Sequence, residues 1–179
     1  MNIANKLTTL RLFLIPVFVI TVMKFSIQSP IPGIIFLIAA ITDFFDGHLA
    51  RSRNLVTTFG KFIDPLADKM LVAAALIMFI EQEIFPAWTV VVVIAREFLI
   101  TGFRIIAASE GVTIAASKWG KSKTVTQFVA IVMVLFMSKL TFIPFKVTSI
   151  IYYVSVVLTV ISGMDYIIKN KEVLDLENI

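Results

Sequence analysis

Long apolar runs alternate with short polar segments along the whole chain. Together with their flanking polar residues, these runs define segments of about the 20 residues that an α-helix needs to cross the hydrocarbon core of a bilayer. Turn-forming residues, such as those at 28–32, and charged segments separate the runs. The pattern predicts an all-α integral membrane fold with six transmembrane helices, at residues 8–26, 33–51, 60–80, 87–109, 120–138 and 144–169.

Little of the chain remains outside these helices. We expect a single six-helix membrane domain over residues 1–179, with a brief interfacial segment at 1–7 and a cytoplasmic tail at 170–179. The composition supports this prediction, because 59% of the residues are hydrophobic and only 16% are charged. A soluble domain is about half apolar and about a quarter charged, so an ordinary soluble fold is excluded.

The positive residues predict how the helices are oriented in the cell membrane. If both termini are cytoplasmic, only Lys24, Lys139 and Lys146 of the 16 lysines and arginines fall toward the outside, as the positive-inside rule requires. The charged residues of the second to fifth helices then gather at cytoplasmic ends, which predicts a polar cavity open to the cytoplasm. The net charge of +4 comes without a long basic run, so we expect contacts with membrane lipids and not with nucleic acid.

Four aspartates interrupt the second and third predicted helices. Asp43 and Asp46 are three residues apart, and Asp64 and Asp68 are four apart, so each pair shares a helix face. Each aspartate inside a span costs about 2.5–3.5 kcal/mol on insertion scales, and this cost must be offset. The chain has no cysteine and one histidine, which leaves oxygen ligands for a metal. We therefore expect two divalent cations, Mg²⁺ or Mn²⁺, between the carboxylates.

These aspartates belong to a longer spaced motif. It reads Asp43-x-x-Asp46-Gly47-x-x-Ala50-Arg51, then eight residues, then Gly60-x-x-x-Asp64-x-x-x-Asp68. The motif resembles the signature of the CDP-alcohol phosphotransferase family at every defining position. The resemblance implies that all four aspartates bind two Mg²⁺ or Mn²⁺ ions and that Asp68 is also the general base.

The same resemblance implies a binding site for CDP-diacylglycerol. The motif positions and one loop hydroxyl that would form it are Gly47, Ala50, Arg51, Thr57 and Gly60. Near the N-terminus, Asn5, Thr8 and Arg11 are similar to a segment that closes over the nucleotide in related enzymes. Asn5 would serve equally well as the N-cap of the first helix.

Polar residues later in the chain bear on the acceptor alcohol. The segments Ala95-Arg96-Glu97, Gly102-x-Arg104 and Ser117-x-x-Gly120-Lys121-x-Lys123-Thr124-x-x-Gln127 resemble the bacterial branch of the family that makes phosphatidylglycerophosphate. That branch transfers a phosphatidyl group from CDP-diacylglycerol to sn-glycerol 3-phosphate and releases CMP. A dianionic acceptor needs a basic pocket, which would be formed by Arg96, Arg104, Lys121 and Lys123. The alternatives are that Arg96 and Glu97 form only an interhelical ion pair and that the two lysines extend to lipid headgroups.

Two other functions remain open at this point. Another family member, such as a cardiolipin or phosphatidylinositol-phosphate synthase, would use the same aspartates with a different acceptor. A cation transporter also places aspartates in a membrane, but it would need no CDP-diacylglycerol and would release no CMP. Because related enzymes are homodimers, the resemblance also implies a homodimer.

Overall fold

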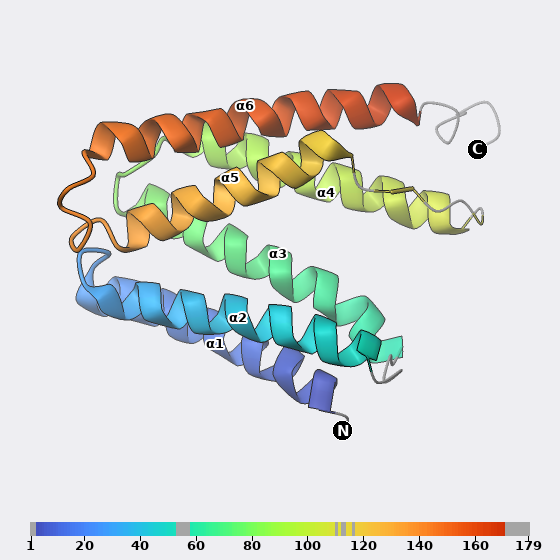
Figure 1. The fold of residues 1–179 in the computed structure, drawn as a ribbon, viewed down its shortest axis with the longest axis horizontal. Helices are drawn as coiled ribbons and strands as arrows, with labels where there is room; N and C mark the ends of the chain where they lie inside the picture. The colour runs from blue at the N-terminus through green and yellow to red at the C-terminus, as the bar shows by residue number, and fades with distance from the viewer. Residues whose placement is uncertain (1–2, 53–57, 110, 112–113, 116, 171–179) are drawn as a thin grey trace. The chain divides into compact units, whose positions relative to one another are not determined.

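The computed structural model describes residues 3–52, 58–109, 111, 114–115 and 117–170, and the side chains of these except residues 3–7, 43–52, 58–65, 68 and 109. The described residues form six α-helices and no strand (Figure 1). The helices are α1 (Ile3–Phe25), α2 (Pro30–Ser52), α3 (Thr58–Glu81), α4 (Ala87–Ser109), α5 (Lys118–Leu135) and α6 (Phe145–Lys169). The all-α prediction is therefore confirmed for this part of the chain.

The helix ends differ from the predicted ones by a few residues. Helix α1 begins at Ile3, so residues 3–7 continue this helix and Asn5 is not its N-cap. Helix α2 begins at Pro30 and not at residue 33, because the first turn of a helix tolerates proline, whose missing N–H has no partner there anyway. Helix α5 ends at Leu135 and not at residue 138. There the backbone changes to a tighter turn, in which the Met137 N–H donates to the Val134 carbonyl.

The chain folds into two compact units, residues 1–85 with 131–143 and residues 86–130 with 144–179. In the first unit, α1 packs against both α2 and α3. The rings of Phe18 and Phe36 meet there with centroids 5.8 Å apart. Gly33 of α2 lies so close to the ring of Phe136 that a Cβ would come within 2.7 Å of it. Whether the two units form one membrane domain stays a prediction.

In the second unit, α4 packs against α6. Near one end of this pair, the hydroxyl of Tyr152 lies 2.7 Å from Oγ1 of Thr89. Toward the other end, Phe103 and Tyr166 pack edge to face, with ring centroids 6.1 Å apart. Both pairs are buried, so the contact between α4 and α6 extends along much of their length.

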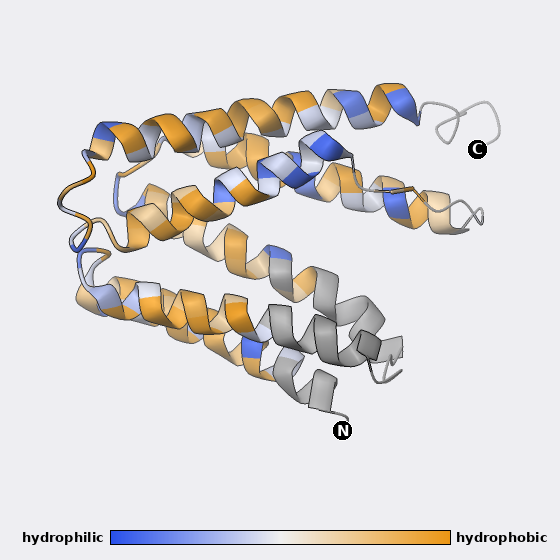
Figure 2. Ribbon diagram, viewed as in Figure 1, coloured by the Kyte–Doolittle hydropathy of each residue, from blue (hydrophilic) through white to orange (hydrophobic). Residues whose placement is uncertain are grey.

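Hydroxyl groups, and not aliphatic side chains, dominate the buried face of α6. They recur every three or four residues, at Thr148, Tyr152, Ser155, Thr159, Ser162 and Tyr166. The exposed face is apolar, with Ile150, Val154, Val157, Ile161, Met164 and Ile168. Figure 2 shows the apolar residues along this helix. Small and polar residues inside with apolar residues outside is the pattern of helices that pack within lipid.

Two helices are long and apolar enough to cross a membrane, within the part of the chain that the structure describes. They are Thr8–Phe25 in α1 and Phe145–Lys169, the whole of α6. A shorter apolar stretch covers Pro30–Thr42 in α2. The full number of membrane spans and the cytoplasmic cavity stay predictions.

Candidate active site

The four motif aspartates lie in the two helices joined by residues 53–57. Asp43 and Asp46 are in the C-terminal half of α2, and Asp64 and Asp68 are in the N-terminal half of α3. These halves lie at the same end of the first unit (Figure 1). The helical backbone supports the prediction that the members of each pair share a helix face. Their side chains lie outside the described part, so metal binding stays a prediction. A donor set of carboxylate oxygens alone does fit Mg²⁺ or Mn²⁺.

Two of the residues predicted to bind the nucleotide are fully buried on α1. Thr8 and Arg11, which share a helix face, both have an exposed fraction of 0%. Burying a guanidinium is costly unless neighbouring groups compensate for its charge, so Arg11 requires polar or charged neighbours at this position. The remaining candidates in helices have side chains outside the described part: Asn5, Gly47, Ala50, Arg51 and Gly60. Thr57 lies outside the described residues.

In the second unit, two of the predicted acceptor-binding cations meet at one carboxylate. Oε1 of Glu97 accepts a hydrogen bond from Nη1 of Arg96 at 3.0 Å and another from Nζ of Lys123 at 2.7 Å. We call Arg96, Glu97 and Lys123 the Glu97 cluster. Lys123 is only 3% exposed. Its ammonium contacts Glu97 and so links α5 to α4. The ion pair between Arg96 and Glu97 lies within α4, and the pair between Lys123 and Glu97 is the one that joins two helices. The two cations give the cluster a net positive charge.

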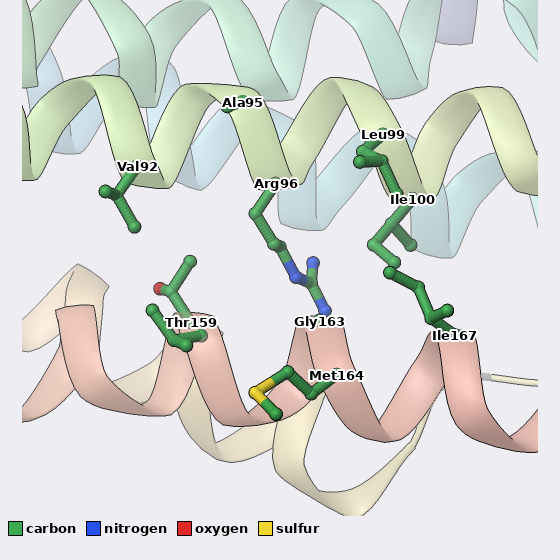
Figure 3. A pocket seen from close by; sticks show the side chains of 10 residues that line it. Val92, Ala95, Arg96, Leu99, Ile100, Thr159, Gly163, Met164 and Ile167 are labelled. Atoms are coloured by element: carbon green, nitrogen blue, oxygen red, sulfur yellow. The ribbon is translucent and has the colours of Figure 1, made fainter.

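Two glycines lie next to the side chain of Arg96, and only at Gly163 would a Cβ approach it more closely than an ordinary van der Waals contact. A Cβ on Gly163 of α6 would lie 3.3 Å from Cγ of Arg96, and a Cβ on Gly120 of α5 would lie 3.5 Å from its Nη2. Figure 3 shows the guanidinium extending from α4 toward Gly163 and Met164. Gly163 was not among the predicted site residues. A glycine inside a helix costs about 0.5–1 kcal/mol relative to alanine, and that cost is the signal that could have identified it.

Arg96 also lines an open groove between α4 and α6 (Figure 3). The groove has a volume of about 230 Å³ and is otherwise mostly aliphatic. Its other lining residues are Val92, Ala95, Leu99, Ile100, Thr159, Val160, Gly163, Met164 and Ile167. Within the described structure, the buried Nε of Arg96 has no hydrogen-bond partner. Arg96 therefore retains a hydrogen-bond donor that Glu97 does not use.

The other two predicted acceptor-binding cations lie at the surface of the same unit. The guanidinium of Arg104 lies over the ring of Tyr166, 5.8 Å from its centroid, as in a cation–π contact. Arg96 and Arg104 both contact α6, which agrees with the prediction that they share one side of their helix. Lys121 is exposed on α5. A role for Arg104 and Lys121 in acceptor binding stays a prediction.

Two further buried donors were not assigned a role from the sequence. Gln127 lies one turn after Lys123 on α5 and is 2% exposed, and Tyr166 on α6 is equally buried. Among the described residues, neither Nε2 of Gln127 nor the hydroxyl of Tyr166 has a hydrogen-bond partner. Gln127 stands in a polar segment that drew attention in the sequence, but spacing alone could not show that its amide is buried and unsatisfied.

Comparison with known proteins identifies similar sequences along nearly the whole chain. Residues 1–161 match the family model of the CDP-alcohol phosphatidyltransferases. The chain is 41% identical to a CDP-diacylglycerol–glycerol-3-phosphate 3-phosphatidyltransferase of Bacillus subtilis, with 99% of each chain covered. It is 39% identical to a protein of that name from Rickettsia bellii, over 92% of this chain and 93% of the relative. It is 40% identical to a probable phosphatidylglycerophosphate synthase of Mycobacterium tuberculosis, over 93% and 80% respectively.

Proposed function

Because the chain belongs to the CDP-alcohol phosphatidyltransferase family, we propose that it transfers the phosphatidyl group of CDP-diacylglycerol to sn-glycerol 3-phosphate. The products are phosphatidylglycerophosphate, a precursor in phospholipid biosynthesis, and CMP. One observation carries this proposal: the chain is 41% identical, over 99% of both lengths, to a relative named for this reaction. The family predicted from the aspartate motif is confirmed by the match over residues 1–161.

We propose that α2 and α3 carry the reaction centre. The residues that would hold two Mg²⁺ or Mn²⁺ ions are Asp43, Asp46, Asp64 and Asp68. Bound there, the ions would supply positive charge next to the diphosphate of the substrate. Asp68 accepts the proton of the attacking hydroxyl as a general base. The support for these roles is the motif and the helical positions of the four residues.

The nucleotide site is proposed at the same helices and α1. Arg11 and Arg51 bind phosphate oxygens, for which a guanidinium offers paired donors. The full burial of Arg11 supports its part in this. The remaining proposed contacts come from small or polar residues at Asn5, Thr8, Gly47, Ala50, Thr57 and Gly60.

For the acceptor, the proposal centres on the Glu97 cluster. Arg96 and Lys123 bind the phosphate of sn-glycerol 3-phosphate, while Arg104 and Lys121, at the surface of the unit, attract the dianion. The net positive charge of the cluster and the unused Nε of Arg96 support this assignment. An uncharged acceptor would have no need of two cations held this way.

We also propose that the protein is a multi-pass protein of the cell membrane. Six helices cross the bilayer, both termini are cytoplasmic, and the active site faces the cytoplasm through a polar cavity. The apolar exposed faces of α1 and α6 and the distribution of lysine and arginine support this arrangement. The proposal that it acts as a homodimer rests on the family resemblance.

The test is an acceptor competition with purified protein in lipid. CDP-diacylglycerol is offered with sn-glycerol 3-phosphate, phosphatidylglycerol, inositol phosphate or serine, and CMP release is measured with and without EDTA. We expect sn-glycerol 3-phosphate to give the fastest release and EDTA to stop it. If phosphatidylglycerol or inositol phosphate is preferred, the chain is a cardiolipin or phosphatidylinositol-phosphate synthase. If no acceptor releases CMP, the enzymatic proposal is wrong and a cation transporter becomes the better explanation.

The proposed base is tested by Asp68→Asn. Removing a general base typically costs about 10²–10⁴ in rate, so we expect CMP release to be lost while the protein still inserts and folds. Asp165→Asn is the control, because Asp165 pairs with Lys169 on α6 and has no proposed role in the reaction. Substantial turnover by Asp68→Asn would refute the assignment.

A further inference from the structure

The amide of Gln127 is a buried donor with no partner in the described structure. The side chain is 2% exposed, and no hydrogen bond reaches Nε2. Leaving a buried polar group unsatisfied costs about 1–3 kcal/mol, and such groups in native proteins call for an explanation, such as a role in the reaction or a bound water or ion. An aliphatic residue at this position would avoid that cost. The amide therefore points to a polar group that the described residues do not provide.

Its position on α5 relates Gln127 to the Glu97 cluster. Gln127 follows Lys123 by four residues, which places both on one face of the helix, about 6 Å apart along its axis. Lys123 is also buried, and its ammonium is held by Glu97 at 2.7 Å. Ala130, three residues further on this face, is fully buried and apolar. The polar part of the face thus consists of a cation and, one turn later, a neutral amide.

This order of groups matches the chemistry of a short polyol phosphate. In sn-glycerol 3-phosphate the phosphate is at one end of a three-carbon chain, and the hydroxyl that attacks is at the other. One hydroxyl, on the middle carbon, takes no part in the reaction. A neutral amide suits it, because a carboxylate there would repel the dianion and a further cation would compete for the phosphate.

We propose that Gln127 is a specificity-determining residue, whose Nε2 donates a hydrogen bond to the middle hydroxyl of the acceptor while the Glu97 cluster holds the phosphate. This inference rests on the proposed function. A site that hydrogen-bonds a substrate hydroxyl discriminates strongly against analogues that lack it, because the protein group is then left unpaired. Gln127 would accordingly select a glycerol phosphate over a simple alkyl phosphate alcohol.

The experiment compares two acceptors in wild type and variants. The first is sn-glycerol 3-phosphate; the second is 3-hydroxypropyl phosphate, which keeps the phosphate and the primary hydroxyl but lacks the middle one. From CMP release, kcat/KM is measured for each. In Gln127→Leu we expect the preference for the first acceptor to fall about tenfold, the value of one hydrogen bond of this kind, while activity with the second is retained.

Two variants make the result specific. Gln127→Asn keeps the amide but withdraws it by one methylene, so its preference should lie between those of wild type and Gln127→Leu; it also provides the test if Gln127→Leu does not fold. Thr126→Val is the control, because the Thr126 hydroxyl donates to the Ser122 carbonyl of its own helix. It should leave the preference unchanged.

The outcomes separate this inference from the proposed function. If both acceptors lose activity equally in the Gln127 variants, the residue is structural and the inference is overturned, although the proposed function stands. The same holds if the variants keep the wild-type preference, as they would if Nε2 only bound a trapped water. If wild type uses neither acceptor, the proposed function fails and this inference fails with it.

Discussion

The two ends of the contact between α4 and α6 treat buried polar groups in opposite ways. At one end, the Thr89 hydroxyl donates to the Pro86 carbonyl at 2.7 Å. The hydroxyl of Tyr152, 2.7 Å from the same Oγ1, must then be the donor in the second bond. Each hydroxyl proton thus has an acceptor within the protein. The hydroxyl donors at this end therefore need no ligand, and their role in helix packing is enough to explain them.

Further along α4 and α6, and on the neighbouring α5, several buried polar atoms have no partner among the described residues. One carboxylate, Glu97, accepts from both Arg96 and Lys123. Within the described structure of this unit, three donors are buried without partners, Nε of Arg96, Nε2 of Gln127 and the hydroxyl of Tyr166, together with one acceptor, Oδ2 of Asp165. Since buried polar groups are normally satisfied, these unsatisfied atoms, most of them donors, support the proposal that a polar ligand binds in this part of the unit. The comparison shows that polar groups alone do not indicate a binding site. What distinguishes a candidate site from a packing contact is whether the buried polar groups have hydrogen-bond partners.

Among the variants that test this comparison, Lys123→Met should have the largest effect on acceptor binding. A hydrogen bond to a charged group is worth about 1.5–3 kcal/mol, so we expect the KM for sn-glycerol 3-phosphate to rise roughly 10- to 150-fold with a smaller change in kcat. The measurement is CMP release as a function of acceptor concentration. Lys118→Met is the matched control, because Lys118 is an exposed lysine at the start of the same helix. A loss of thermal stability with an unchanged KM would reduce Lys123 to a structural ion-pair partner.

Gly163→Ala should produce a smaller effect through Arg96. The added Cβ would lie 3.3 Å from Cγ of Arg96, so the arginine must move by a few tenths of an ångström. A displaced side chain costs about 0.5–1.5 kcal/mol, which corresponds to a KM for the acceptor about two- to tenfold higher. Stability should change little, because the gain of up to about 1 kcal/mol for alanine over glycine in a helix offsets a displacement cost of similar size.

Gly102→Ala provides the control for Gly163→Ala. A Cβ on Gly102 of α4 would meet nothing within 4 Å, so this variant gains the same helix propensity without touching Arg96. We expect an unchanged acceptor KM in Gly102→Ala. Equal KM values in both variants would show that the position of Arg96 does not matter for the acceptor.

Much of the fold could be predicted from the sequence, because apolar runs of this length have few alternatives to helices. The predicted range of α4, residues 87–109, agrees with the structure at both ends. The predicted start of α2, at residue 33, is wrong, because the helix begins at Pro30. Prolines at 30 and 32 suit a turn, but the first turn of a helix accepts them too. Such errors arise where a residue is equally compatible with a turn and with the first turn of a helix.

The candidate site shows a sharper limit. Helix geometry places Lys121 and Lys123 about 200° apart, so the sequence does show that the two lysines face different directions. It does not show which of them is buried, since that depends on how α5 packs against α4. The contact between Gly163 and Arg96 likewise cannot be predicted from the sequence. It joins residues of α4 and α6, and the spacing of residues within one helix contains no information about it.

The smallest effect we predict concerns two tyrosines of α6. Tyr152→Phe removes a hydroxyl that donates to Thr89, and hydrogen bonds between membrane helices are worth about 0.6 kcal/mol on average, so the variant should be destabilised by about that amount. Tyr166→Phe removes a buried hydroxyl without a partner in the described structure, while the ring that Arg104 covers remains. It should therefore be as stable as wild type or slightly more stable. Unfolding of the detergent-solubilised variants by SDS measures both free energies. If Tyr166→Phe lost as much stability as Tyr152→Phe, its hydroxyl would be satisfied after all, and the contrast between the two ends of the helix pair would disappear.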